Sequence, residues 1–437
     1  MKFAALALAS CLYVAIVLSA GRTAWSQSPY ATIFPNLVDF PAGIGGEPIG
    51  DLFRQGPIGG GTYYGITTSG NPAVYALPYP AFPEQPTLLA PIPVGAPTAI
   101  VPTVDSSGSP TALYSMTDQG WLYKSSLTPD FPTLVGSLGQ TIDNAGTPQG
   151  SLVSDGTAVY GTTTNGGAGG DGIIYRISLD GSGAHRLHDF ATGGGGAPVG
   201  GLTAVPVLSF PQGVAVTTTM LFGTTSTGGA FGDGTLFEIN LSGGGFKVLH
   251  DFNGADGAAP MTALTVVGNT VFGTTSAGGT ANDGTVFSFN TLDNSFQSLH
   301  SFTGADGAHP MAALATFPLV IEEANPPIFA GAAIVGTTYD GGDANKGTLF
   351  YMQPDGTFHS LYSFHGPDGA HPMGPIIWTG PFAADFLGTT MNGGADGAGT
   401  VFRGSFNLPE PSSVALGLLG VIMLGVRGAV ARKQPSR

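Results

Sequence analysis

Residues 222–302 decide the fold, because they contain two copies of one pattern. Residues 222–271 read FGTTSTGGAFGDGTLFEINLSGGGFKVLHDFNGADGAAPMTALTVVGNTV, and residues 272–302 then read FGTTSAGGTANDGTVFSFNTLDNSFQSLHSF. The second copy begins 50 residues after the first (272 − 222) and keeps almost every feature in register. A fixed period of this length is typical of repeat architectures, in which each copy forms one structural unit.

Seven copies of the first half of this pattern follow one another along the chain. Their leading hydrophobic residues are Tyr64, Tyr114, Tyr160, Phe222, Phe272, Val335 and Leu387. The copies at 64 and 114 are degraded, and longer intervals before Phe222 and Val335 indicate inserts. We expect residues 322–327 to form the tip of a surface loop, where added residues cost least.

The chain starts and stops in the middle of a repeat. Residues 37–40 (LVDF) match residues 249–252 (LHDF), which belong to the second half of the pattern. After residues 399–403 (GTVFR) no second half follows. The two partial units complete one repeat between them, so we expect seven repeats in a ring closed by the two ends.

Each repeat reads as four short β-strands. Runs of Val, Thr, Phe, Tyr and Leu alternate with Gly, Asn and Asp, and Gly268-Asn269 between two such runs is a hairpin signal. A four-stranded unit cannot bury both of its faces alone, and radial repetition of such a unit makes a propeller. The predicted fold is therefore all-β, a β-propeller of seven four-stranded blades over residues 27–407.

Composition agrees with a compact exported protein. Gly (71) and Pro (34) are frequent, but 42% of residues are hydrophobic and the Gly residues are periodic, which indicates turns. Between Gln27 and Leu408 there are 7 basic residues (13 − 6) and 27 acidic ones (28 − 1). This balance argues against a nucleic-acid partner, which needs a basic surface.

Residues 1–26 have the layout of a secretory signal peptide. Lys2 precedes an apolar run from Phe3 to Ala20, and Ala24-Trp25-Ser26 offers small residues for cleavage before Gln27. An uncleaved membrane helix and lipidation at Cys11 are the alternatives. Because Cys11 is the single cysteine, the mature chain would have no disulfide.

The repeat resembles the GloVer-type tandem repeat of extracellular bacterial proteins. The residues that carry the likeness follow the pattern GTTSxGGxxxDGTVFxFxxxxxFxxLHxFxGADGAxPxxxL, most fully in the copies at 160, 222, 272 and 335. The resemblance implies secretion and display at the cell surface, and it implies no defined catalytic activity.

Residues 408–437 resemble a PEP-CTERM sorting tail. Pro409-Glu410-Pro411 precede a 13-residue apolar run from Val414 to Val426 and a basic end. The resemblance implies an exosortase-type processing enzyme as partner and transient anchoring in the inner membrane. A helix of this length spans about 20 Å, less than the hydrocarbon core of a bilayer. An ordinary C-terminal anchor is the alternative.

Histidine and aspartate recur at fixed places in the repeat. His188, His250 and His300 share one position, which is Tyr362 in the next copy, while His309 and His371 share another. Like residues spread around a ring indicate a repeated packing or hydrogen-bonding role, with metal ligation or acid/base chemistry as the alternative. Asp256, Asp306 and Asp368, and also Asp171, Asp233 and Asp283, precede Gly, which is typical of turns, and Ca²⁺ binding is the alternative.

No motif for catalysis is present, and no catalytic residue or cofactor is predicted. The sequence favours a secreted binding or structural protein of the cell surface or matrix, with an extracellular polysaccharide or biofilm matrix as partner. A carbohydrate-active hydrolase or lyase built on the propeller is the alternative. Selective function is expected in the degenerate copies and inserts rather than in the consensus.

The repeated glycines lead to a first test. We expect them to occupy positions of positive φ or of close approach between strands, so that Gly273→Val lowers the melting temperature clearly. Ala281→Ser, at a variable loop position, serves as the control and should leave it unchanged. Equal melting temperatures for the two variants would contradict these assignments.

Overall fold

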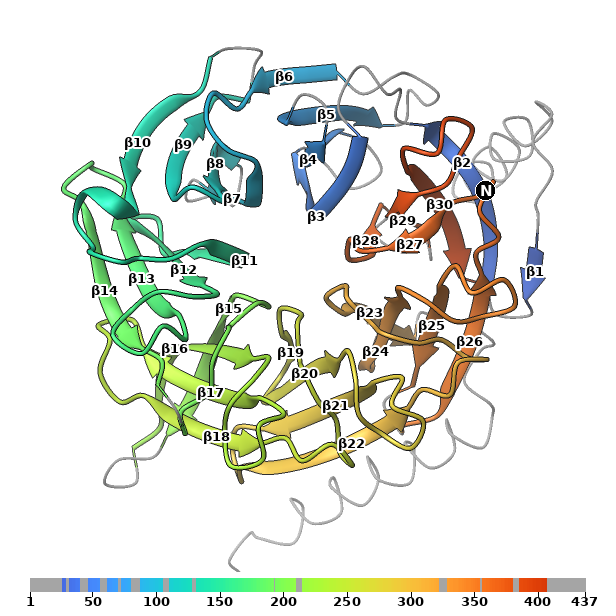
Figure 1. Cartoon of the computed structure of the whole chain (residues 1–437). Helices are drawn as coiled ribbons and strands as arrows, with labels where there is room; N and C mark the ends of the chain where they lie inside the picture. Colours follow the sequence, from blue (N-terminus) through green and yellow to red (C-terminus); the bar gives the residue numbers. More distant parts are fainter. Residues whose placement is uncertain are drawn as a thin grey trace, which may run out of the picture.

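The structure is a computed structural model in which a ring of β-sheets surrounds a central axis (Figure 1). The described residues are 26–28, 31–39, 46–55, 61–69, 72–79, 87–104, 110–127, 131–191, 193–209, 214–321, 328–353, 356–379 and 385–406. Within them the strands form six four-stranded sheets and one six-stranded sheet. The predicted β-propeller is therefore confirmed.

The six four-stranded sheets follow one another in chain order, each running from the axis to the rim (Figure 1). The first three comprise β3 (Gly46–Gln55), β4 (Gly61–Ser69), β5 (Ala73–Tyr79) and β6 (Thr87–Pro91); β7 (Pro97–Val104), β8 (Pro110–Thr117), β9 (Trp121–Ser125) and β10 (Thr133–Ser137); and β11 (Pro148–Ser154), β12 (Ala158–Thr163), β13 (Ile173–Ser178) and β14 (Ala184–Asp189). A 3₁₀ turn, Leu138–Gln140, follows β10.

The other three contain the best-preserved repeats. They comprise β15 (Leu202–Ser209), β16 (Val216–Thr225), β17 (Thr235–Asn240) and β18 (Lys247–Asp251); β19 (Thr265–Val267), β20 (Thr270–Thr275), β21 (Thr285–Asn290) and β22 (Ser295–Ser301); and β23 (Ala315–Ile321), β24 (Ile328–Thr338), β25 (Thr348–Met352) and β26 (Phe358–Ser363). All pairs within these sheets are antiparallel.

The seventh sheet closes the ring with strands from both ends of the chain. It comprises β1 (Ser26–Ser28), β2 (Ala31–Asp39), β27 (Ala370–Pro372), β28 (Ile377–Trp378), β29 (Asp385–Asn392) and β30 (Thr400–Phe406). β2 pairs antiparallel with β30, from Ala31 opposite Phe406 to Asp39 opposite Thr400. The predicted closure is confirmed, but four strands is wrong for this blade, because β1 is added and two short inner strands pair with β29.

A glycine beneath an aromatic ring recurs in the middle strands of the blades. Gly273 of β20 lies opposite Phe287 of β21, and a Cβ at Gly273 would come within 2.4 Å of that ring. Only a glycine leaves room for the ring to cover the strand. The same pairs recur as Gly223–Phe237, Gly336–Phe350 and Gly388–Phe402. Gly273 thus owes its identity to close approach, whereas Gly278, Gly279 and Gly284 have positive φ.

The second Thr of the Gly-Thr-Thr motif ties the same two strands together. Thr275 Oγ1 lies 2.9 Å from Thr285 Oγ1 and accepts a hydrogen bond from the Thr285 backbone N–H at 3.0 Å. Both side chains are fully buried, so their hydroxyl groups need these partners. Equivalent pairs lie at Thr225–Thr235, Thr338–Thr348 and Thr390–Thr400.

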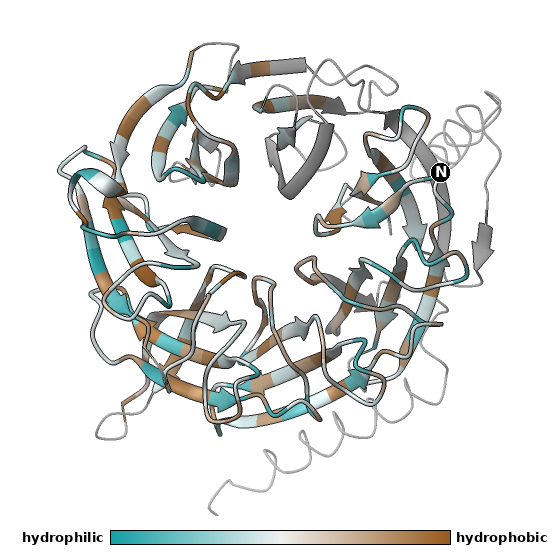
Figure 2. Ribbon diagram, viewed as in Figure 1, coloured by the Kyte–Doolittle hydropathy of each residue, from teal (hydrophilic) through white to brown (hydrophobic). Residues whose placement is uncertain are grey.

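The hydrophobic core lies between neighbouring blades. One cluster combines Phe222 and Leu236 of the β15–β18 sheet with Val271 and Phe287 of the β19–β22 sheet, all at most 1% exposed. Figure 2 shows apolar residues interleaved with polar ones along the strands. Each buried Phe contributes about 2 kcal/mol by leaving water, so every blade depends on the next for its burial.

The predicted inserts lengthen inner hairpins. β15 and β16 pair over eight positions, from Leu202 opposite Gly223 to Ser209 opposite Val216. The equivalent β19–β20 hairpin has three pairs, and the insert before Val335 extends β23 and β24. The expected loop tip at 322–327 lies outside the described residues.

Closure of the ring by β2 gives a test of the architecture. We expect a chain without residues 27–45 to melt at a markedly lower temperature than the full chain or to aggregate, because β30 loses its hydrogen-bonded neighbour and becomes an open edge. Thermal melting and light scattering measure the two effects. An unchanged melting temperature would show that the ring does not depend on this pairing.

Candidate functional site

The consensus histidines join neighbouring blades. The ring of His250 stacks on Phe296 of the next blade, with centroids 3.6 Å apart, and His300 stacks on Phe358 at 3.7 Å. Each histidine also bonds an aspartate six residues later, with His250 Nε2 3.0 Å from Asp256 Oδ2. The packing role predicted for these histidines is what their contacts indicate.

The same packing lowers the affinity of these imidazoles for protons. Burial lowers the pKa of His300 below its ordinary value of 6.5, against the opposing effect of the Asp306 carboxylate. Burial also lowers the pKa of His188, which stacks on Phe246 at 3.7 Å, with Asp189 opposing. In the next blade Tyr362 replaces the histidine, and its hydroxyl group donates to Asp368.

The aspartates of the GADG loops are held by hydrogen bonds within their own turns. Asp306 Oδ1 accepts from the Thr303 backbone N–H at 2.8 Å and from Thr303 Oγ1 at 3.0 Å. Across the described residues, no group of three or more His, Cys, Asp or Glu side chains could hold a metal ion. The loops therefore fit the predicted turn role.

One blade departs from the repeat at several positions on its loops and rim. In the β23–β26 blade Tyr339 and Asp340 stand where the β19–β22 blade has Ser276 and Ala277. Further polar or aromatic residues replace simpler ones in the same way, namely Asp343 for Thr280, His365 for Thr303 and His309 for Ala259. Four of the eight histidines, His309, His359, His365 and His371, lie in or beside this blade.

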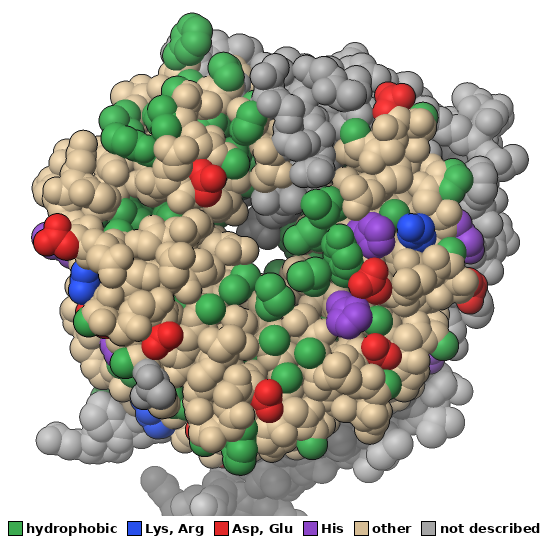
Figure 3. Space-filling model, in the orientation of Figure 1, with side chains coloured by type: hydrophobic (Ala, Val, Ile, Leu, Met, Phe, Trp, Pro, Cys, Tyr) green, Lys and Arg blue, Asp and Glu red, His purple; other side chains and the backbone are tan. Residues whose placement is uncertain are grey.

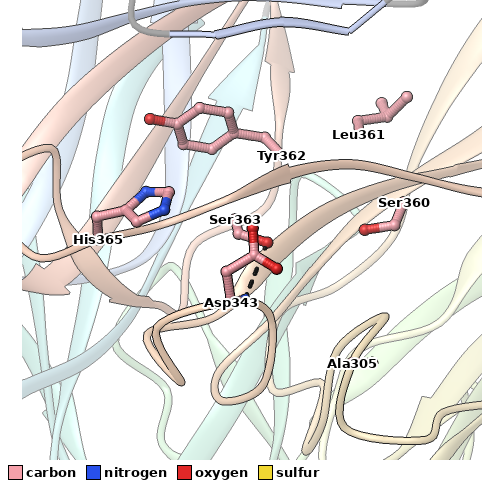
Figure 4. Close-up of a pocket in the computed structure, with 7 residues that line it drawn as sticks. All are labelled: Ala305, Asp343, Ser360, Leu361, Tyr362, Ser363 and His365. Atoms are coloured by element: carbon pink, nitrogen blue, oxygen red, sulfur yellow. Dashed lines mark hydrogen bonds between the residues drawn. The ribbon is translucent and has the colours of Figure 1, made fainter.

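Two of these departures, Asp343 and His365, line a pocket of about 570 Å³. Its walls are Ala305, Asp343, Ser360, Leu361, Tyr362, Ser363 and His365, which come from three loops and from the rim strand β26 (Figure 4). The Asp343 backbone N–H donates to Ser363 Oγ at 3.3 Å, and the side chain of Asp343 lies between those of His365 and Ser360 in the view (Figure 4). The pocket therefore offers hydroxyl, carboxylate and imidazole groups.

A buried carboxylate holds the pocket's aromatic wall. Asp368, only 2% exposed, accepts from the Tyr362 hydroxyl group and from the His365 backbone N–H at 2.8 Å. Burial, and then the hydrogen bond to Asp368, raise the pKa of Tyr362. The side chain of His365 is 51% exposed, and its Nδ1 lies 3.6 Å from Asp368 Oδ2. The imidazole is thus accessible and lies beside a buried carboxylate.

A second polar group crosses from this blade to the closing sheet. His309 Nδ1 lies 3.1 Å from Asp340 Oδ2, and His371 Nε2 lies 3.7 Å from Asp340 Oδ1. His371 Nδ1 is 3.1 Å from Asn392 Oδ1, and the ring stacks on Tyr339 at 4.6 Å. Figure 3 shows histidine and acidic side chains gathered over these two sheets.

The fold supplies the backbone on which these histidines stand. His309 and His371 have φ values of +51° and +55°, and the matching Ala197 and Ala259 have +46° and +49°. The left-handed conformation therefore belongs to the repeat itself. The β23–β26 blade and the closing sheet differ in having a histidine at this position, with Asp340 or Asn392 as its polar partner.

Sequence reasoning named His309, His371, Tyr362 and Asp368 but missed Tyr339, Asp340, Asp343 and His365. A column-by-column alignment of the repeats could have found them as polar substitutions in a well-preserved copy. The pocket lies in a well-preserved copy and not in the degraded copies at 64 and 114, although the insert before Val335 belongs to the same blade. The sorting residues Pro409, Glu410 and Pro411 lie outside the described residues.

Comparison with known proteins finds a match to a known repeat and solved structures with a similar fold. Residues 209–318 match the Gloeobacter/Verrucomicrobia repeat, so the chain contains this repeat. No curated protein sequence matches the chain. An oligogalacturonate lyase from Vibrio parahaemolyticus has a similar structure, with a TM-score of 0.53, 12% identity and coverage of 89% of this chain and 97% of the lyase. Another oligogalacturonate lyase, in complex with manganese, has a TM-score of 0.52 and 14% identity, and the match covers 90% of this chain and 97% of that lyase.

At these identities the likeness extends to the propeller fold alone. No helix in the described part of the chain has the length and apolar character needed to cross a membrane. The apolar segments at 3–20 and 414–426 are not among the described residues.

The stacked histidines predict a pH dependence of stability. Because burial lowers the pKa of His300 in the folded chain, folding favours the neutral imidazole. Its stabilising effect is present above the unfolded pKa of about 6.5 and is lost as pH falls below that value towards the folded pKa. His300→Tyr, which copies Tyr362, should reduce the fall in melting temperature between about pH 7.5 and about pH 5.

His185→Tyr, at an exposed position of β14, is the matched control and should keep the full acid sensitivity. An acid sensitivity in His300→Tyr equal to that of the unmodified chain would show that the His300 stack does not contribute.

Proposed function

We propose that this protein is exported, displayed at the cell surface, and binds an extracellular polysaccharide through the β23–β26 blade. One observation carries the binding role: three residues at which this blade departs from the β19–β22 copy, Asp343, Tyr362 and His365, line one pocket. Substitutions that served packing alone would not need to gather around a shared space.

The chemistry of the pocket suits a hydroxyl-rich ligand. Ser360 and Ser363 can each donate and accept a hydrogen bond, Asp343 accepts, and His365 presents an accessible ring. Tyr362 and Leu361, each only 5% exposed, back these polar groups with buried apolar surface.

Export is supported by the two ends of the chain and by the repeat. Residues 1–26 have the layout of a signal peptide, and residues 408–437 resemble a PEP-CTERM tail with Pro409-Glu410-Pro411 at its start. The matched repeat is the type that the GloVer resemblance associates with extracellular proteins. In this proposal an exosortase-type enzyme recognises the tail after transient anchoring in the inner membrane.

A binding assay tests the proposed role directly. The full-length chain, purified in detergent, should be retained by at least one immobilised polysaccharide without cleaving it. Asp343→Ala should weaken retention about tenfold, because one hydrogen bond to a charged group contributes roughly 1.5 kcal/mol. Ala230→Ser, at the matching position of the β15–β18 blade, is the control and should bind normally.

The same assay weighs the enzymatic alternative, which the shared fold of the oligogalacturonate lyases keeps open. Shortening of the polymer, or the appearance of unsaturated sugar ends, would replace the binding role with a hydrolase or lyase. Absence of both retention and cleavage for every polysaccharide would contradict the proposal.

The sorting tail has its own test. Replacing Pro409-Glu410-Pro411 with alanines should leave the melting temperature unchanged, because these residues follow β30, yet hold the unprocessed chain in the membrane fraction. Cell fractionation with immunodetection measures this. Processing and release at the normal level would exclude the motif as the recognition signal.

A further inference from the structure

Building on the proposed binding role, we infer that the pocket of the β23–β26 blade takes an uncharged glycan and excludes glycans that carry carboxylate groups. This ligand class follows from the charges that line the pocket, from the neighbouring group of His309, Asp340 and His371, and from the net charge of the propeller.

The pocket has an acidic character that nothing in its lining offsets. Asp343 is the charged residue of the lining, and no Lys or Arg is among the seven lining residues. Lys346 lies in the same turn as Asp343 but outside the lining. A carboxylate group on the ligand would therefore meet Asp343 without a cation to receive it.

The imidazoles of His365, His309 and His371 lie beside carboxylates of the protein. His365 Nδ1 lies 3.6 Å from Asp368 Oδ2, so a charged ring would face an existing carboxylate. His309 and His371 lie 3.1 and 3.7 Å from the two oxygens of Asp340. Asp368 thus faces one of these imidazoles, and the other two share the carboxylate of Asp340.

The net negative charge of the propeller also disfavours glycans that carry carboxylate groups. Between Gln27 and Leu408 the chain has 7 basic residues against 27 acidic ones. Among the basic residues, Arg403 is paired with Asp385 at 2.6 Å and Arg186 with Asp189 at 2.9 Å. A polyanion approaching this surface is repelled, whereas a neutral chain is not. The inferred ligand class is therefore uncharged, unlike an oligogalacturonate.

The experiment compares neutral and acidic polymers on the full-length chain in detergent. The neutral panel is starch, dextran, galactomannan and xyloglucan, and the acidic panel is polygalacturonate and alginate. We expect retention by at least one neutral polymer, with affinity changing less than about twofold between low and high salt. We expect no retention by either acidic polymer at low salt.

Two variants of Asp343 and one control test whether the pocket sets the charge preference. Asp343→Ala should weaken neutral binding about tenfold, while Asp343→Lys should create retention of polygalacturonate at low salt by supplying the missing cation. Ala230→Lys, in the β15–β18 blade, adds the same charge elsewhere and should not.

The outcomes separate the two proposals. Retention of polygalacturonate or alginate by the unmodified chain, lost in Asp343→Ala, would overturn the inferred ligand class while leaving the binding role intact. Failure of both panels would overturn both. Equal retention of polygalacturonate by Asp343→Lys and Ala230→Lys would show that the pocket does not set the charge preference.

Discussion

The pairing of β2 with β30 is the constraint on which the rest of the ring depends. Every blade buries its apolar faces against its neighbours, as Phe222 and Phe287 do across one junction, so no blade completes its core alone. A row of such blades with free ends would expose apolar surface at both. The antiparallel pairing from Ala31 to Asp39 removes those ends, and it allows strands that contain no cysteine to form a closed domain.

Within this ring the repeat separates packing from recognition. Gly273 and Phe287 fix the spacing of two strands, the threonine pair fixes their register, and the stacked histidine joins one blade to the next. These residues recur because each junction has the same geometry. The loops between these residues also recur in conformation, so their side chains can differ from blade to blade. In the β23–β26 blade, side chains from these loops line a pocket.

The sequence predicted the fold well because the fold is set by what repeats. The period, the hairpin signals and the split unit at the chain ends together specified the propeller and its closure. The extra strand β1 and the split inner strand of the closing sheet could not be foreseen, since strand counts came from the consensus. The pocket was missed because Asp343 and His365 are distant in sequence and become neighbours only when β26 brings their loops together.

The order in which the closing strands are made has a consequence for how the protein matures. Ala31 and Phe406 are register partners although 375 residues (406 − 31) separate them in the chain. A ribosome makes β2 early and β30 last. The ring therefore cannot close until the final blade has been synthesised, and until then β2 lacks its partner β30. Contacts of such long range form slowly, so this propeller would reach its native state late, after synthesis rather than during it.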